Sequence, residues 1–494
     1  MSSKKNYFYI LIPLASFFYF LSTPPLSITP FYFLSFTMIF YLYLGKKSFN
    51  LKLLFIFFFL NYFFSLSWIS QSFQTGGALY IVLGILMIFL LSSFLALLNI
   101  LFIGLFNKIV LKRNIRIILI PLSLTLVAMI KEFLLGGFPW NPSSIIWVNN
   151  LYILKIVQLI GIYGFGIINH LLIALFLYGL FNKQKIILLS CSLLIFVVYS
   201  LQFIPFNKDR FYDKDGEPIS ILIIQPNIKE SLVNFSTIKK IEIYEKQTKE
   251  ALREYPNSDL IIWPEGALNI DLNNKKALLK RFGNLLSNNQ NLILGANALT
   301  NDKLYNRMYY INNKGDVEQS YDKQKLVLFG EYMPFDGYKI SKFLDMGLSF
   351  SMGKKNNHMN LNKNFIVSPM ICFESIFDYS GINNKICKTD FILQISNDSW
   401  FGNYIGPSQH FKNSLLRSVE QKMTLVRSTP SGISAVVNTD GQILDKIDNN
   451  KKGHMNFNIF KSSNKQECKP FLNIAIILIL LMYLLGILYD RIRR

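Results

Sequence analysis

Eight apolar segments, of which the first seven are joined by short loops that are alternately free of Lys and Arg and basic, decide what this 494-residue chain can fold into. A helix needs about 20 predominantly apolar residues to cross the roughly 30 Å hydrocarbon core of a membrane. The apolar segments are close to this length, and each is predicted to be a transmembrane helix. They lie at residues 7–22, 29–44, 53–70, 79–105, 117–135, 152–180, 186–204 and 471–489.

The basic residues predict how these helices are oriented, because Lys and Arg concentrate in cytoplasmic loops. They precede the first helix and follow the second, fourth, sixth and eighth, whereas the three intervening short loops contain none. Both termini are therefore expected in the cytoplasm and the long segment after the seventh helix outside it. We expect a seven-helix membrane domain at residues 1–205, an extracytoplasmic domain at 206–469, and an eighth helix with a basic cytoplasmic tail at 470–494.

The net charge of +21 would favour nucleic-acid binding if the basic residues shared one soluble surface. Residues 207–469, however, hold 35 Lys and Arg against 28 Asp and Glu, and the rest of the chain holds 16 against 2. Most of the excess therefore lies beside the apolar segments, and we expect no nucleic-acid partner. The cysteines are too few for a disulfide framework; they are Cys191, Cys372, Cys387 and Cys468.

Two other interpretations of the apolar half fit the sequence less well. A cleaved signal peptide would explain the charged start and apolar run of residues 7–22, but no A-x-A-like site follows it. A channel or transporter would usually carry more ionisable groups within its helices. Within the apolar segments, Glu132 is the only acidic residue that lies well inside one, and His170 is the only histidine.

Residues 206–469 alternate between short apolar runs and amphipathic stretches, which is typical of an α/β domain with a mixed sheet covered by helices. Helices are predicted at about 237–255, with Ser236 or Thr237 as its cap, at 275–287 and at 409–422. Two hairpins are predicted, 309–311 with 317–321 and 435–437 with 443–447. Further strands are predicted at Ser220–Ile224, Leu260–Trp263, Leu292–Leu294, Phe365–Ile371 and Phe391–Ile395.

Three segments of this half end in an ionisable residue that could carry chemistry: Glu265, Lys323 and Cys372. Glu265 comes directly after a predicted strand, at the sheet edge where open α/β sheets bind ligands. Lys323 lies eight residues before Glu331, and Cys372 follows a strand directly, as a nucleophile at a strand-to-helix turn does. Taken singly, each also has an ordinary interpretation: a capping carboxylate, a polar loop and a buried cysteine.

Together, these segments resemble the Glu–Lys–Cys triad of the nitrilase superfamily. The matching motifs are Trp263-Pro264-Glu265, Tyr321-Asp322-Lys323 with Phe329-Gly330-Glu331, and Ile371-Cys372-Phe373-Glu374. Other motifs, and the insertion of the domain between the seventh and eighth helices, resemble the membrane-embedded branch of that superfamily, the apolipoprotein N-acyltransferases. These motifs are Phe138-Pro139-Trp140, Ser396–Gly402 with Trp400, Gly406–His410 and Arg427–Thr429.

The resemblance implies an α-β-β-α sandwich for residues 206–469 and a role for each triad residue. Cys372 would be the nucleophile, Glu265 the general base and acid, and Lys323 the positive charge that stabilises the oxyanion and the thiolate. Glu331, Glu374 and Phe373 would support the triad. Trp140, Trp400 and Phe235, the last near the position of a functional Trp in the family, would bind substrate.

The chain also departs from the family pattern. Leu328 replaces a Pro before Phe-Gly-Glu, Phe373 replaces the Tyr after the nucleophile, and Pro430-Ser431 replaces an Asn pair. None of these changes touches the triad, although Phe373 cannot make the hydrogen bond of a Tyr hydroxyl.

The resemblance further implies the reaction and its partners. A phospholipid, expected to be phosphatidylethanolamine, would give its sn-1 acyl chain to Cys372, and the α-amine of a diacylglyceryl-cysteine apolipoprotein would then accept it. The expected location is the inner membrane of a Gram-negative bacterium, with the catalytic domain on the periplasmic side. No cofactor is implied, and His358, His410 and His454 lack metal-ligand spacing.

Two other function classes stay open from the sequence. A membrane-tethered amidase or nitrilase would use the same triad but transfer the acyl group to water, and one anchoring helix would suffice for it. A transport or structural membrane protein with an inactive binding domain would not need the triad at all.

Overall fold

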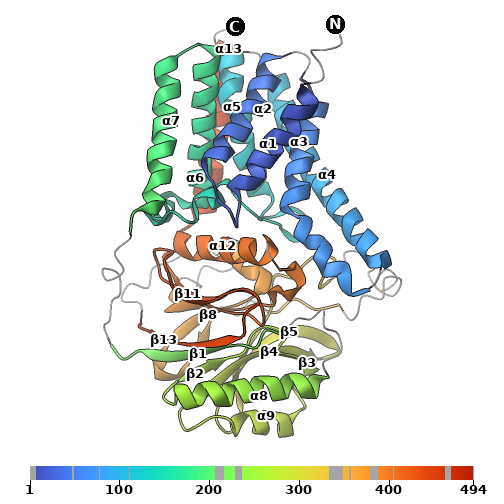
Figure 1. Cartoon of the computed structure of the whole chain (residues 1–494), viewed down its shortest axis with the longest axis vertical. Coiled ribbons are helices and arrows are strands. Elements are labelled where there is room, and N and C mark those ends of the chain that lie inside the picture. Colours follow the sequence, from blue (N-terminus) through green and yellow to red (C-terminus); the bar gives the residue numbers. More distant parts are fainter. Residues whose placement is uncertain are drawn as a thin grey trace.

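The computed structural model of the chain describes residues 7–46, 49–76, 78–110, 112–205, 216–228, 236–332, 349–354, 358–378, 388–403, 405–461 and 469–492 (Figure 1). Three residues named above, Phe235, Cys387 and Cys468, lie outside these ranges.

Every predicted apolar segment contains a helix. In the described ranges, five helices are long and apolar enough to cross a membrane: α4 (Ala78–Ile109), α5 (Arg113–Ile130), α6 (Leu151–Phe181), α7 (Lys185–Ser200, extended by a 3-10 turn to Phe203) and α13 (Phe471–Ile492). The apolar helices α1 (Phe8–Ser22) and α2 (Pro30–Gly45) are shorter. Thus helix formation was predicted correctly, and the number of membrane spans stays a prediction.

Two details of the apolar half differ from the prediction. The expected continuous helix at 53–70 is broken, because α3 (Leu51–Ser65) is followed by a 3-10 helix, η1 (Ser67–Gly76), at an angle of 48°. The helix α5 ends at Ile130, so Glu132 lies beyond its end rather than well inside a span. Its carboxylate has partners in the other half of the chain.

The returning helix α13 packs beside α5 and α6, as the red and green ribbons of Figure 1 show. Its buried side chains, among them Ile479 and Tyr483, share one apolar cluster with Leu119 of α5 and Tyr163 of α6. The C-terminal helix therefore closes the bundle on one side.

The other half of the chain contains two stacked mixed sheets. The first has the strand order β13-β1-β2-β4-β5-β6, with β3 beside β4, and the second has the order β12-β11-β10-β9-β8-β7. In the first, β1, β2 and β4 are parallel, and in the second β8, β9 and β10 are parallel. The strands of the first sheet are β1 (Ile219–Gln225), β2 (Leu260–Ile262), β3 (Leu268–Asp271), β4 (Asn291–Thr300), β5 (Lys303–Ile311), β6 (Val317–Asp322) and β13 (Gly453–Ile459); those of the second are β7 (Met359–Asn360), β8 (Ile366–Ile371), β9 (Phe391–Ile395), β10 (Thr424–Ser428), β11 (Ser434–Val437) and β12 (Ile443–Ile447).

Alternating side chains of each strand fill two different layers, as the period of a strand dictates. In β1, Ile221 and Ile223 lie in the core between the sheets, whereas Leu222 and Ile224 lie under the helices α8 (Thr237–Glu254) and α9 (Lys276–Gly283). The outer face of the second sheet packs against α12 (Ile405–Glu420). The order of layers is therefore α-β-β-α, as expected from the resemblance.

The predicted helices and hairpins are largely confirmed. Ser236 caps α8, its hydroxyl accepting a 3.3 Å hydrogen bond from the Lys239 N–H. The helix α9 is shorter than predicted, and α12 begins four residues earlier than predicted at Ile405. Pro407 lies in the first turn of α12, where its missing N–H costs no helical hydrogen bond.

The helix α12 lies between the second sheet and the apolar helices (Figure 1). Its Phe411 and Leu415 belong to one cluster with Ile392 of the sheet and with Trp140, which precedes α6. Gln158 of α6 also donates a 2.6 Å hydrogen bond to the carbonyl of Thr439, in the β11–β12 turn. The two halves are joined by a continuous core rather than by a linker alone.

A buried ion pair crosses the same junction. Arg417 of α12 pairs with Glu132, donates a 3.0 Å hydrogen bond to Glu420, and donates a 2.9 Å hydrogen bond to the carbonyl of Ile376. The Arg417 and Glu132 side chains are only 2% and 3% exposed. Because buried charges are costly unless paired, each half of the chain satisfies a charge of the other.

Candidate active site

Glu265 follows β2 and Trp263-Pro264 at the carboxyl end of the strand, as predicted. The neighbouring strand β4 passes very close to it at Gly295, where a Cβ atom would lie 2.6 Å from the Glu265 Cα. Glycine at this position therefore lets β4 run beside the glutamate. The Glu265 carboxylate accepts a 2.7 Å hydrogen bond from the backbone N–H of Asn397, after β9.

Lys323, which follows β6, binds both predicted glutamates. Its ammonium lies 3.3 Å from Glu265 Oε1 and 2.8 Å from Glu331 Oε1, and its side chain is 1% exposed. The amide of Asn306, in β5, donates hydrogen bonds of 2.7 Å to Glu265 and 3.2 Å to Glu331. Two carboxylates, one ammonium and one amide thus form a buried cluster with a fixed geometry.

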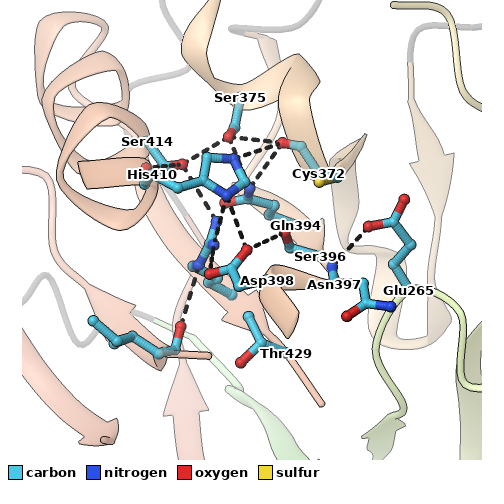
Figure 2. A network of polar contacts seen from close by, with 12 residues as sticks. Glu265, Cys372, Ser375, Gln394, Ser396, Asn397, Asp398, His410, Ser414 and Thr429 are labelled. Carbon is cyan, nitrogen blue, oxygen red and sulfur yellow. Dashed lines mark hydrogen bonds and ion pairs between the residues drawn. The ribbon is translucent and has the colours of Figure 1, made fainter. Parts of the chain in front are cut away.

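Cys372 is the first residue after β8 and has a positive φ of 54°. A non-glycine residue in this region is strained, and such strain gathers at active sites. In Figure 2 the sulfur points to the side on which Glu265 lies, whereas the backbone carbonyl points to His410. That carbonyl accepts hydrogen bonds from Ser375 and Gln394, both 3.1 Å, and lies 3.3 Å from His410 Nε2.

The charges around Cys372 act in opposite directions on its thiol. Burial and the nearby Glu265 carboxylate raise the pKa of Cys372, and the positive charge of Lys323 lowers it without cancelling the rise. The resting side chain is therefore a thiol, which needs a base in order to react. Burial also raises the pKa of Glu265, with Lys323 opposing the rise, so this carboxyl is a stronger base than an exposed one.

The pKa of Lys323 lies well above its ordinary value. Burial would lower that pKa, but Glu265, Glu331 and Cys372 all raise it and together outweigh the burial. Lys323 is therefore a permanent positive charge, suited to a developing oxyanion rather than to proton transfer.

Glu374 binds the loop that follows Lys323 and not the lysine itself. It accepts hydrogen bonds from the backbone N–H groups of Gln324 (2.6 Å), Lys325 (3.0 Å) and Ile371 (2.7 Å), and from the Tyr321 hydroxyl. Burial raises the pKa of Glu374 to about 7. The residue ties the ends of β6 and β8 together, which fixes Lys323 relative to Cys372.

A second buried cluster lies behind the Cys372 carbonyl (Figure 2). Asp398 accepts a 2.6 Å hydrogen bond from Arg427 and a 2.8 Å one from Ser396, and lies 2.9 Å from His410 Nδ1. Burial would raise the pKa of Asp398, but Arg427 and His410 hold it well below its ordinary value. The carboxylate thus orients His410 and anchors the arginine.

The aromatic residues proposed for substrate binding fall in different surroundings. Trp140 is buried, donates a 2.7 Å hydrogen bond to Gln409, and stacks with Phe138, whose ring lies 6.3 Å from that of Phe373. Trp400 is 42% exposed, 3-10 helical, and accepts a hydrogen bond from Ser72 at its carbonyl. Phe235 lies outside the described residues.

The comparisons with known proteins give the family. Residues 15–176 match the apolipoprotein N-acyltransferase N-terminal domain, and residues 223–459 match the carbon-nitrogen hydrolase domain. The apolipoprotein N-acyltransferase of Rickettsia prowazekii is 31% identical over 384 residues, which are 73% of this chain and 75% of the relative. The chain belongs to the apolipoprotein N-acyltransferase family.

Another member of this family, the apolipoprotein N-acyltransferase of Brucella suis, is 29% identical over 355 residues, or 67% of this chain and 65% of that protein. The match thus covers slightly less than two thirds of the length of the Brucella relative. Among solved structures, a CN-hydrolase superfamily protein from Xanthomonas campestris aligns with 50% of this chain and 91% of its own, at 16% identity and a TM-score of 0.38.

Several polar residues of the site were not assigned from the sequence. Asn306 has no signal in the sequence, because it is one polar residue in the middle of a strand. Asp398, His410 and Arg427 stand in motifs that resemble the family, but their contact arises only where β9, α12 and β10 meet. Within the described part of the chain, no group of three His, Cys, Asp or Glu side chains could hold a metal ion.

Proposed function

We propose that this protein transfers a fatty acyl chain from a phospholipid, through a thioester on Cys372, to the α-amine of the diacylglyceryl-cysteine of apolipoproteins. One observation carries the proposal: Lys323 is held between Glu265 and Glu331 and interacts electrostatically with a buried cysteine at a strained strand end. Family membership supports the choice of substrates.

In the first half-reaction, Glu265 takes the proton of the Cys372 thiol while the sulfur attacks the sn-1 ester carbonyl. The ammonium of Lys323 stabilises the oxyanion of the tetrahedral intermediate. The carbon–oxygen bond then breaks, and the protonated Glu265 returns its proton to the leaving alkoxide. The products are the acyl-enzyme and a lysophospholipid.

In the second half-reaction, the lipoprotein amine attacks the thioester carbonyl. Glu265 accepts a proton from the amine, the carbon–sulfur bond breaks, and the Cys372 sulfur takes that proton back from Glu265. An amide forms, and the enzyme returns to its resting thiol. Glu331 binds Lys323, and the Asn306 amide binds both Glu265 and Glu331, so the two residues keep Lys323 and Glu265 in place through both steps.

The apolar half explains how both substrates could reach Cys372. Phospholipid and diacylglyceryl-cysteine are both membrane-anchored, and removing acyl chains into water costs about 0.8 kcal/mol per methylene. We propose eight spans, with residues 1–205 and 470–494 in the inner membrane of a Gram-negative bacterium and 206–469 on its periplasmic face. The alternation of basic loops supports this orientation.

The direct test uses the full chain in detergent micelles with phosphatidylethanolamine alone. We expect one fatty acyl mass on the Cys372 peptide and an equal amount of lysophospholipid. A diacylglyceryl-cysteine peptide added afterwards should discharge the label into an amide, with ping-pong kinetics. Cys372→Ala should abolish both steps, whereas Cys191→Ala, in α7, should not, and neither should Cys387→Ala.

The same experiment separates the competing functions. A hydrolase would release free fatty acid without the peptide, and an inactive binding module would show no acylation. Rapid release of fatty acid with no amide product would overturn the proposed transfer while leaving the triad in place.

A further inference from the structure

A cavity of about 60 Å³ lies inside the apolar half, beside the active site. This is several times the roughly 10–15 Å³ that one water molecule needs. Helices α1 to α6 and the loop before α6 contribute to its lining. Phe138 and Trp140 form the wall nearest the catalytic half, since they contact Phe373 and Gln409. The cavity therefore ends one aromatic layer from the residue that follows the nucleophile.

A buried ammonium, that of Lys131, lies at this cavity. Lys131 is 7% exposed, and its ammonium donates a 2.9 Å hydrogen bond to the carbonyl of Trp140. Among the described residues, no carboxylate forms an ion pair with it, because the neighbouring Glu132 binds Arg417 and the Tyr163 hydroxyl. An ammonium has three donors, and a buried charge is costly unless paired.

Two more polar groups of α3 line the same space. Asn61 is 3% exposed, and neither polar atom of its amide has a hydrogen-bond partner among the residues that the structure describes. The Tyr62 hydroxyl accepts a 2.9 Å hydrogen bond from Asn99, which leaves its own proton available as a donor. Buried polar groups are normally paired, so an unsatisfied amide facing a cavity points to a ligand.

The composition of the lining indicates what that ligand is. No Asp or Glu side chain occurs among the described lining residues, and the remaining walls are mostly aromatic or aliphatic. Such a site suits an anionic group with many acceptor oxygens that is joined to an apolar body. A phosphodiester joined to glycerol and acyl chains has this chemistry.

We propose that this cavity binds the phosphodiester of the acyl-donor phospholipid on Lys131, Asn61 and Tyr62. The inference rests on the proposed function, because it assigns the headgroup site for the same donor. Phosphate bound there would lie next to the Phe138–Trp140 wall and thus bring the sn-1 ester close to Cys372. A free phosphate ion has the same charged group as the lipid, but it has no apolar part to contact the walls of the cavity.

The binding test uses the full chain with Cys372→Ala, so that no acyl transfer occurs. Native mass spectrometry measures how much phosphatidylethanolamine, chain-matched diacylglycerol or inorganic phosphate each variant retains. Lys131→Met and Asn61→Leu should lose phosphatidylethanolamine and leave diacylglycerol unchanged, whereas Lys131→Arg should retain it. Lys108→Met, at an exposed lysine of α4, is the matched control and should not differ.

The kinetic test uses the active enzyme and two acyl donors. A p-nitrophenyl ester has no phosphate and should acylate Cys372 equally in the parent and in Lys131→Met. For phosphatidylethanolamine, Lys131→Met should raise KM by about tenfold or more with little change in kcat. A tenfold change in KM corresponds to the strength of one hydrogen bond to a charged group. Equal acylation by the p-nitrophenyl ester also shows that the variant is folded.

Different failures have different meanings. The inference is overturned if the parent and Lys131→Met have equal KM values for phosphatidylethanolamine. It is also overturned if the parent retains phosphatidylethanolamine and diacylglycerol equally; in both cases the cavity holds water only. Retention of inorganic phosphate in preference to the lipid would assign the site to a free anion and overturn it as well. Loss of lipid binding in Lys131→Met without any acyl transfer by the parent would sustain the site and overturn the proposed function.

Discussion

Arg427 donates a 2.6 Å hydrogen bond to Asp398, and both side chains are completely buried. Through His410, which lies between Asp398 and the carbonyl of Cys372, this pair fixes the backbone of the proposed nucleophile. The strained φ of Cys372 persists because its carbonyl is held on several sides at once.

Asp398→Asn should destabilise the protein strongly. The substitution keeps the shape of the side chain but leaves the Arg427 charge without its counter-ion, a loss that typically costs about 3–5 kcal/mol. Thermal unfolding in detergent micelles measures the effect. Asp302→Asn, in the exposed turn between β4 and β5, should unfold like the parent, and equal midpoints for all three proteins would contradict the role of the pair.

Lys323→Met should lower the rate of acylation by about 10²–10³, the usual effect of losing one oxyanion-stabilising group. Both the oxyanion and the thiolate that forms on Cys372 lose the stabilising charge. Single-turnover formation of the acyl-enzyme provides the measurement. The matched control is Lys303→Met, at the exposed start of β5, and a rate for Lys323→Met within threefold of that control would rule out the assigned role.

Gly295→Ala should displace Glu265. The added methyl group would lie 2.6 Å from the Glu265 Cα and 2.7 Å from the Pro264 carbonyl oxygen, so the two strands must separate. We expect a destabilisation of about 1–3 kcal/mol and a larger fractional loss of acylation. Gly104→Ala, whose methyl group would lie 3.5 Å from Leu51, should be tolerated. Full activity in Gly295→Ala would mean that Glu265 does not need its present position.

Stability should fall as the pH rises from about 4.5 to 7. Burial raises the pKa of Glu420 to about 7, with Arg417 lowering it and Asp378 raising it, and Glu374 also has a pKa of about 7. The folded protein therefore binds protons more tightly than the unfolded chain in this range, which makes the slope negative. Glu420→Gln should flatten the dependence of the unfolding temperature on pH without abolishing it, because Glu374 remains. A slope unchanged in the variant would contradict the assignment.

Reporter fusions test the orientation. A reporter fused after Lys208 should behave as extracytoplasmic and one fused after Arg494 as cytoplasmic. Both junctions lie outside the described residues, so the expectation comes from the alternation of basic loops alone. A cytoplasmic reporter at Lys208 would contradict the span count and the proposed supply of lipid substrates.

Local sequence signals predicted the parts of the site that one segment makes alone. Cys372 at the end of β8, Glu265 after β2 and the Ser236 cap each depend on neighbours in the chain. Asn306, by contrast, meets Glu265 only because β5 lies beside β4, and no local pattern marks that pairing. For the same reason no local pattern marks the ion pair of Glu132, because its partner Arg417 lies 285 residues away.

The ion pair between Arg417 and Glu132 bears on how this protein can be produced and assayed. A carbon-nitrogen hydrolase domain expressed without the apolar helices would keep Arg417 and lose Glu132, and the side of α12 that now contacts Trp140 would face water. Such a fragment would keep Glu420 but lose the second of the two carboxylates that neutralise Arg417, and it would expose an apolar surface on the helix that holds the Ile376 carbonyl near Cys372. Detergent-free production of an excised domain should therefore yield aggregates, and screening for inhibitors calls for the intact chain.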